Sequence, residues 1–170
     1  MAIFFIIAAV VLRLVPHLPN FAPIAALGLF GGVYLNKKYA LAVPLVAMFF
    51  SDYFLGFAEF WVTFSIYSSF LLIGLIGLKL RNHKKLPYIF GATLAGSIIF
   101  FVLTNFAVWV ATPWYPKTLQ GIISCYTLAI PFFRNTILGD LFYVGSIFGL
   151  YEFALFVTRK KATIIKTVRI

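Results

Sequence analysis

Apolar stretches follow one another along almost the whole chain, and short basic or polar segments separate them. They lie near residues 2–15, 21–36, 39–57, 60–79, 87–111 and 134–158, and a shorter apolar piece covers 118–132. A membrane-spanning helix needs about 20 residues to cross about 30 Å of hydrocarbon. We therefore predict an all-α protein, a polytopic membrane helical bundle of six transmembrane helices.

The composition excludes a soluble globular protein. Hydrophobic residues make up 63% of the 170 residues and charged residues only 11%, which leaves too few polar groups to cover a soluble surface. We expect residues 1–158 to form a single transmembrane domain in the lipid bilayer and residues 159–170 to form a basic cytoplasmic tail. The formal net charge of +10 would indicate nucleic acid in a soluble protein, but here the charges report orientation, and we expect no nucleic-acid partner.

The basic residues are concentrated in the segments that follow the second, fourth and sixth predicted spans. Eleven of the fourteen lie there: Lys37, Lys38, Lys79, Arg81, Lys84, Lys85, Arg159, Lys160, Lys161, Lys166 and Arg169. By the positive-inside rule, this side of the membrane is cytoplasmic. We predict a multi-pass protein of the inner (plasma) membrane with both termini in the cytoplasm.

The apolar piece at 118–132 does not fit this pattern as a full span, because an odd number of crossings would separate the basic tail from the other two clusters. We interpret it as a short half-helix on the outer side, although a seventh span is an alternative. Three amphipathic aromatic residues that favour the headgroup level precede it: Trp109, Trp114 and Tyr115.

Polar residues inside the apolar stretches collect in the outer half of the predicted bundle. Asp52 lies about 7 Å and Asn105 about 9 Å below the outer ends of their spans at the usual rise per residue. Arg134, Asn135 and Asp140 occupy the same layer. Ionisable residues inside a membrane are functional candidates, although buried polar residues also bridge helices without any other role.

We predict an outward-facing pocket in this layer. Its candidate substrate-binding residues are Asp52, Asn105, Arg134, Asn135 and Asp140, with Trp109, Trp114 and Tyr115 as a gate. The planar guanidinium of Arg134 would hold an anionic or carbonyl group, and Asp52 and Asp140 would pair with Arg134 when the pocket is empty.

Small residues four apart recur in the second predicted span, where Ala22 precedes Ala26 and Gly28 precedes Gly32. Such patterns let helices approach closely. They predict either packing inside the bundle or a docking surface for another membrane subunit.

Motifs for catalysis and cofactor binding are missing from the sequence. It contains no GxxxxGK[ST], HExxH or GxSxG, and the single cysteine, Cys125, excludes an internal disulfide framework. We therefore expect no enzymatic activity, no metal and no cofactor. A less favoured alternative is an intramembrane enzyme that uses Asp52 and Asp140 as paired carboxylates.

Four segments carry a resemblance to a known family: "RLVPHLPNFAPIAALGLFGG", "PLVAMFFSDYFLG", "TNFAVW" and "YPKTLQGIISCYTLAIPFFRNTILGDLFY". The chain resembles a family of small uncharacterised bacterial integral membrane proteins with no established activity. More distantly, its six predicted spans, the Ala22xxxAla26 pattern and "AMFFSDYFLG" resemble the substrate-binding S components of energy-coupling factor vitamin transporters.

The S-component resemblance implies a binder of a vitamin-sized solute. In that family, the loop after the first helix closes the pocket, and small-residue helix faces dock on a transmembrane coupling subunit driven by ATPases. The leading hypothesis is therefore a membrane solute-binding or transport subunit. The alternative is a non-catalytic structural subunit of a larger membrane protein complex.

Overall fold

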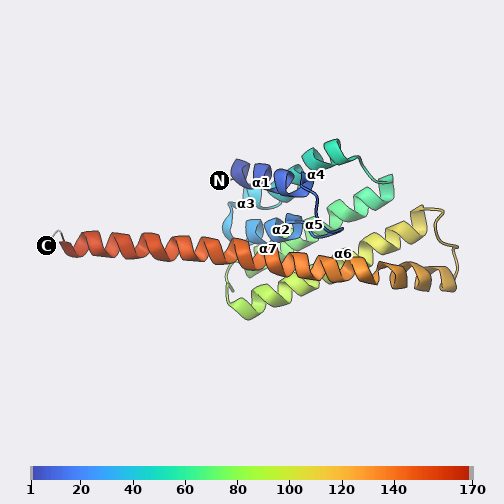
Figure 1. The fold of residues 1–170 in the computed structure, drawn as a ribbon. Helices are drawn as coiled ribbons and strands as arrows, with labels where there is room; N and C mark the ends of the chain where they lie inside the picture. Colours follow the sequence, from blue (N-terminus) through green and yellow to red (C-terminus); the bar gives the residue numbers. More distant parts are fainter. Residues whose placement is uncertain (1, 169–170) are drawn as a thin grey trace.

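The computed structural model describes the backbone of residues 2–168 and the side chains of residues 3–159, and all regular secondary structure in this part of the chain is helical (Figure 1). The helices are α1 (Ala2–Leu14), α2 (Ile24–Tyr34), α3 (Lys37–Ala40), α4 (Ala42–Leu55), α5 (Phe60–Leu80), α6 (Leu86–Ala111) and α7 (Leu119–Val168). The predicted all-α class is confirmed.

Four segments of the described chain are long and apolar enough to cross a membrane: Lys37–Leu55, Phe60–Leu80, Leu86–Ala111 and Leu119–Arg159. They correspond to the third to sixth predicted spans and indicate a membrane protein. The first two predicted spans form α1 and α2, with 13 and 11 residues. At about 1.5 Å per residue these helices are shorter than the hydrocarbon layer, so a full crossing by either remains a prediction.

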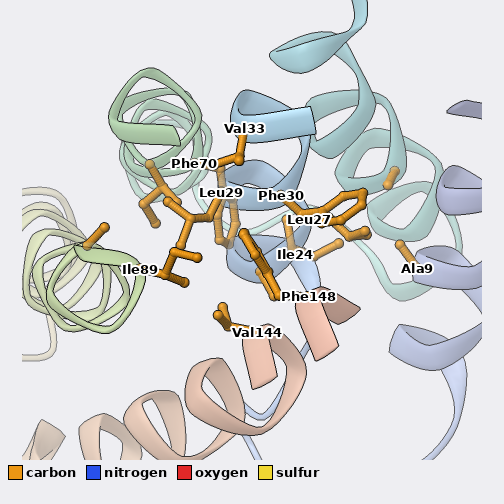
Figure 2. Close-up of a cluster of buried hydrophobic side chains, with 14 of the residues drawn as sticks. Ala9, Ile24, Leu27, Leu29, Phe30, Val33, Phe70, Ile89, Val144 and Phe148 are labelled. Carbon is orange, nitrogen blue, oxygen red and sulfur yellow. The ribbon is translucent and has the colours of Figure 1, made fainter. Parts of the chain in front are cut away.

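Helix α2 is the centre of the molecule. Nine of its 11 residues are buried, which explains why its sequence is apolar on every side rather than on one face. It packs against α4, α5, α6 and α7. Figure 2 shows Leu29 and Phe30 of α2 surrounded by Ala9, Phe70 and Phe148 from three other helices.

The glycines of α2 bring α5 into close contact. A Cβ atom added to Gly32 would lie 2.5 Å from the carbonyl carbon of Gly77, and one added to Gly28 would lie 3.6 Å from the backbone oxygen of Phe70. Ala26 is fully buried in the same helix. These small residues therefore serve packing inside the bundle, and α5 already occupies the face predicted as a docking surface at Gly28 and Gly32.

The predicted division between a half-helix at 118–132 and a span at 134–158 is wrong, because α7 runs without interruption through both. Pro131 lies inside α7 and removes one backbone donor. Membrane helices tolerate such a proline because neighbouring groups satisfy the freed carbonyl, whereas a helix end in an apolar stretch would leave several groups unsatisfied.

The basic segments at residues 37–38 and 79–85 lie at one end of the bundle, the end from which α7 projects (Figure 1). The guanidinium of Arg81 donates to the backbone oxygen of Gly32 at 2.9 and 3.1 Å, and Lys84 lies 4.4 Å above the ring of Tyr34. The Tyr34 hydroxyl donates to Glu152 of α7. The turn after α5 thus packs on the end of α2, as expected if these clusters share one side of the membrane.

Candidate functional site

A cavity of about 400 Å³ lies where α1 ends and the chain turns back into α2. Its apolar walls come from α2, α4, α5 and α6, through Ile24, Met48, Ile66, Phe70 and Phe100. Its polar lining consists of Arg13, His17, Asn20, Thr136 and Asp140. Polar groups on one part of an otherwise apolar wall are typical of sites for small molecules.

Arg13 and Asp52 form an ion pair beside this cavity. The Nη1 atom of Arg13, in the last turn of α1, lies 2.6 Å from Oδ1 of Asp52, in the last turn of α4. Tyr67 of α5 donates its hydroxyl to Oδ2 of the same carboxylate at 2.8 Å. Asp52 therefore joins three helices, and both of its oxygens have partners.

The Arg13 guanidinium also stabilises the end of α4. It donates to the hydroxyl of Ser51 and, at 3.4 Å, to the backbone oxygen of Met48. These contacts tie the last turn of α1 to the last two turns of α4. The N–H donors of Arg13 are shared among Asp52, Ser51 and Met48. The positive charge of Arg13 is therefore already compensated in the cavity wall.

Asp140 forms the second polar group of the cavity, on the side of α7. Its side chain is 3% exposed, and its Oδ2 atom lies 2.6 Å from the hydroxyl of Ser97 on α6. Within the described residues it has no ion pair. Asp140 is thus a buried carboxyl group with one hydroxyl partner and the cavity on its other side.

The connection between α1 and α2 borders the cavity and is exposed from Val15 to Asn20. Asn20 has a φ of 64°, a left-handed conformation that asparagine adopts more readily than most residues. The Nδ1 atom of His17 lies 2.8 Å from the backbone oxygen of Leu18. This segment is therefore the part of the cavity border that is most accessible from outside the bundle.

The pairing predicted for Arg134 is wrong. Arg134 is exposed, does not line the cavity, and has no hydrogen bond or ion pair among the described residues. Asp52 instead pairs with Arg13, and Asp140 bonds to Ser97. Six residues separate Arg134 from Asp140, so the two project from different faces of α7.

The other predicted site residues lie away from the cavity as well. Asn105 donates to the backbone oxygen of Phe101 in its own helix at 2.7 Å, and Asn135 is half-buried beside Arg134. Of the residues proposed for the pocket, the structure therefore brings Asp140 to the cavity and Asp52 to its wall through Arg13.

The three aromatic residues proposed as a gate cluster at the turn between α6 and α7. The Nε1 atom of Trp109 donates to the backbone oxygen of Pro116 at 3.0 Å, and Lys117 lies 6.0 Å from the Trp109 ring. Trp114 is 73% exposed and Tyr115 is half-buried. None of the three lines the cavity, and their positions suit the membrane–water interface.

Sequence reasoning missed Arg13, Tyr67 and Ser97 as site residues. For Arg13 a signal existed, because it is a cation near the end of an apolar stretch at the same predicted depth as Asp52. For Tyr67 and Ser97 the sequence holds no comparable signal, because neither side chain carries a charge and a serine hydroxyl can bond to the backbone of its own helix.

Residues 1–164 match a family of unknown function, DUF6580. The chain belongs to this family. The match covers nearly the whole chain and agrees with the resemblance to small uncharacterised membrane proteins. No curated protein and no solved structure is similar to the chain.

The arrangement offers two kinds of chemistry to a bound molecule. Arg13 and Asn20 provide polar groups near the mouth, and Asp140 provides a deeper carboxyl group. Among residues 3–159, no three His, Cys, Asp or Glu side chains lie close enough together to hold a metal ion. The cavity thus presents hydrogen-bonding and charged groups to an otherwise apolar volume.

Proposed function

We propose that this chain is a membrane solute-binding or transport subunit. It takes a small, vitamin-sized solute into the cavity beside Arg13 and Asp140 and catalyses no reaction. The observation that carries the proposal is the cavity itself, which joins a polar lining to apolar walls within the helix bundle. Its volume, about 400 Å³, lies within the range of small-molecule sites.

The polar lining supports binding over a purely structural role. Hydrogen bonds between helices require contact, and a polar group that only joins helices has no need of adjoining empty space. Here Arg13 and Asp140 both border one cavity, although each also contacts a neighbouring helix. The connection at Val15 to Asn20 would admit the solute from the outer side of an inner membrane, with both termini in the cytoplasm.

The test is a screen of vitamin-sized solutes by thermal unfolding of the purified protein in detergent. A ligand at about one hundred times its Kd stabilises the folded state by about 2.7 kcal/mol. We expect at least one solute to raise the unfolding temperature of the parent but not of Ala25→Leu, which fills the cavity from α2. Ala154→Leu, at an exposed position of α7, is the matched control. A screen in which both variants respond like the parent would contradict the proposal.

The S-component resemblance adds a partner to this proposal: a transmembrane coupling subunit with ATPases. Because α5 covers Gly28 and Gly32, such a partner would contact other faces of the bundle. Purification from native membranes tests this part separately, and recovery of an ATPase would support it.

A second candidate is a non-catalytic structural subunit of a larger membrane complex, and two glycines of α7 favour it. A Cβ atom added to Gly145 or Gly149 would meet no heavy atom within 4 Å, and both positions are exposed. Small residues four apart permit close helix contacts in membranes. If this function is correct, replacing both glycines with leucine will remove a co-purifying membrane subunit, while Ala25→Leu will not.

A further inference from the structure

Asp140 lines the cavity and has one carboxylate oxygen without a hydrogen-bond partner among the described residues. Its Oδ2 atom contacts Ser97, whereas no described residue forms a hydrogen bond with Oδ1. Every fully buried polar side-chain atom in the described chain has a partner, so Oδ1 is not fully buried, and Asp140 lines the cavity. A buried carboxyl group with a free oxygen is a binding position for a hydrogen-bond donor.

Ser97 shows which form of Asp140 fits the empty cavity. The Ser97 hydroxyl lies 2.6 Å from Oδ2 of Asp140 and 3.1 Å from the backbone oxygen of Thr93. A hydroxyl has one proton and can donate to only one of these two oxygens. Both contacts are satisfied together when Asp140 is protonated, donates to Ser97, and Ser97 donates to Thr93.

An ionised Asp140 would need a compensating cation. A charge inside a membrane protein is costly without a partner, and Arg13 is committed to Asp52. The described chain supplies no other ion pair for Asp140, so a cation from outside the protein would complete the site.

Resting on the proposed function, we propose that the solute carries a protonated amine that docks on Asp140 in exchange for a proton. In the empty cavity, Asp140 holds a proton. When the ammonium group enters, the O–H bond of the carboxylic acid breaks, the proton leaves to solvent through the mouth, and the ammonium pairs with the carboxylate. The charge inside the cavity is the same before and after, because one cation replaces another.

Other titratable groups around the cavity do not replace Asp140 in this role. From the α1 side, Arg13 is paired with Asp52, and His17 lies in the exposed connection. From α4 and α5, Asp52 and Tyr67 are bonded to each other and face Arg13. Helices α2 and α6 contribute no ionisable side chain to the cavity lining, and on α7 itself Tyr143 lies one turn beyond Asp140 and packs against Phe21.

The rest of the solute would be apolar and compact. Ile66, Phe70 and Phe100 form the wall contributed by α5 and α6. Aromatic and branched side chains at such a wall favour a ring or short hydrocarbon attached to the amine.

The experiment compares three probes that share one ring and differ in the polar group: phenethylamine, phenethyl alcohol and hydrocinnamate. Binding is measured by calorimetry on the purified full chain, in two buffers that differ in ionisation enthalpy, so that proton release is counted. We expect the amine to bind most tightly and to release one proton per molecule bound. Its affinity should then rise about tenfold per pH unit wherever Asp140 is protonated in the empty cavity.

Asp140→Asn is the decisive variant, because it keeps the shape and a group that can donate to Ser97 but cannot ionise. We expect it to weaken amine binding about tenfold to hundredfold and to abolish proton release, the usual loss for a charged hydrogen bond. Glu152→Gln removes a carboxylate twelve residues further along α7, outside the cavity lining, and should bind like the parent. Thermal unfolding of each variant checks that it is folded.

The remaining outcomes overturn the inference. Equal or tighter binding of the alcohol or the carboxylate would leave a solute-binding cavity but remove its preference for amines. Amine binding that survives in Asp140→Asn would place the amine elsewhere, and binding without proton release would refute the exchange. If no probe binds the parent, the amine assignment fails, while the broader solute screen still tests the proposed function by itself.

Discussion

The guanidinium of Arg13 lies 2.6 Å from the carboxylate of Asp52 and joins the ends of α1 and α4. The side chains of Arg13 and Asp52 are only 19% and 9% exposed. Because the pair is shielded from water, dissolved ions weaken its attraction only slightly. Each charge depends on the other to offset the cost of removing it from water. The pair is thus a structural element of the cavity wall as well as a polar group near its mouth.

Replacing Arg13 with alanine should destabilise the protein by about 3 kcal/mol, because it leaves the Asp52 charge buried without its cation. Adding Asp52→Asn should restore part of this loss, because the neutral amide no longer carries the stranded charge. Thermal unfolding of the two single variants and the double variant in detergent measures the coupling. Strict additivity would show that the two residues do not interact.

Arg134→Ala is the matched control for this pair. Arg134 is exposed and has no ion pair among the described residues. Its replacement should change the free energy of unfolding by less than about 0.5 kcal/mol, as is usual for surface positions. A loss as large as that of Arg13→Ala would mean that Arg134 has a partner in the native membrane.

Tyr67→Phe should cost about 1.5 kcal/mol, because it removes the 2.8 Å hydrogen bond to the Asp52 carboxylate while keeping the ring. Tyr53→Phe is the control, since Tyr53 is 71% exposed on the same helix as Asp52. Chemical unfolding in mixed detergent compares the two. If both substitutions are neutral, the Tyr67 hydroxyl does not support Asp52.

The general fold could be predicted from the sequence because it depends on apolar length and on the placement of charge. The boundaries of α5 and α6 follow the apolar stretches closely, since basic turns interrupt them. The continuity of α7 could not be predicted in the same way. In water, a proline such as Pro131 usually ends a helix. In an apolar environment the helix continues through it, because the backbone has no other hydrogen-bond partners there.

The site was predicted in outline only. Depth along the helices could be read from the sequence, and it predicts one polar layer for Asp52 and Asp140; in the structure Asp140 lines the cavity and Asp52 pairs with Arg13, another residue of its lining. The direction of each side chain around its helix axis could not, because α7 is apolar on most of its circumference and gives no clear periodicity. Arg134 was therefore preferred to Arg13, which lies at the required depth and on the required face.

The orientation of the chain is tested by labelling. A cysteine at Asn82, in the turn after α5, should resist a membrane-impermeant thiol reagent in intact cells, because this turn is rich in basic residues, which favour the cytoplasmic side. A cysteine at Thr118, in the turn before α7, should be labelled. The native Cys125 is 1% exposed and is replaced by serine in both variants to remove background. Labelling at Asn82 but not at Thr118 would show that the protein has the opposite orientation in the membrane.

Gly32→Ala tests how α2 is held at the centre of the bundle. The added Cβ would lie 2.5 Å from the carbonyl carbon of Gly77, a backbone atom that cannot move aside without shifting α5. We expect a loss of about 3 kcal/mol, at the upper end of the usual cost of overpacking. Because α2 also supplies Ile24 and Ala25 to the cavity, solute binding should weaken together with stability.

Gly91→Ala provides the comparison, since a Cβ added there would meet no heavy atom within 4 Å and the residue lies inside α6. Alanine restricts the unfolded chain and favours the helix, so this variant should gain about 0.5 to 1 kcal/mol. Unfolding of both variants under one set of detergent conditions separates close packing from helix propensity. If Gly32→Ala were as stable as Gly91→Ala, the tight contact between α2 and α5 would not exist, and the small residues of α2 would again be available to another membrane subunit.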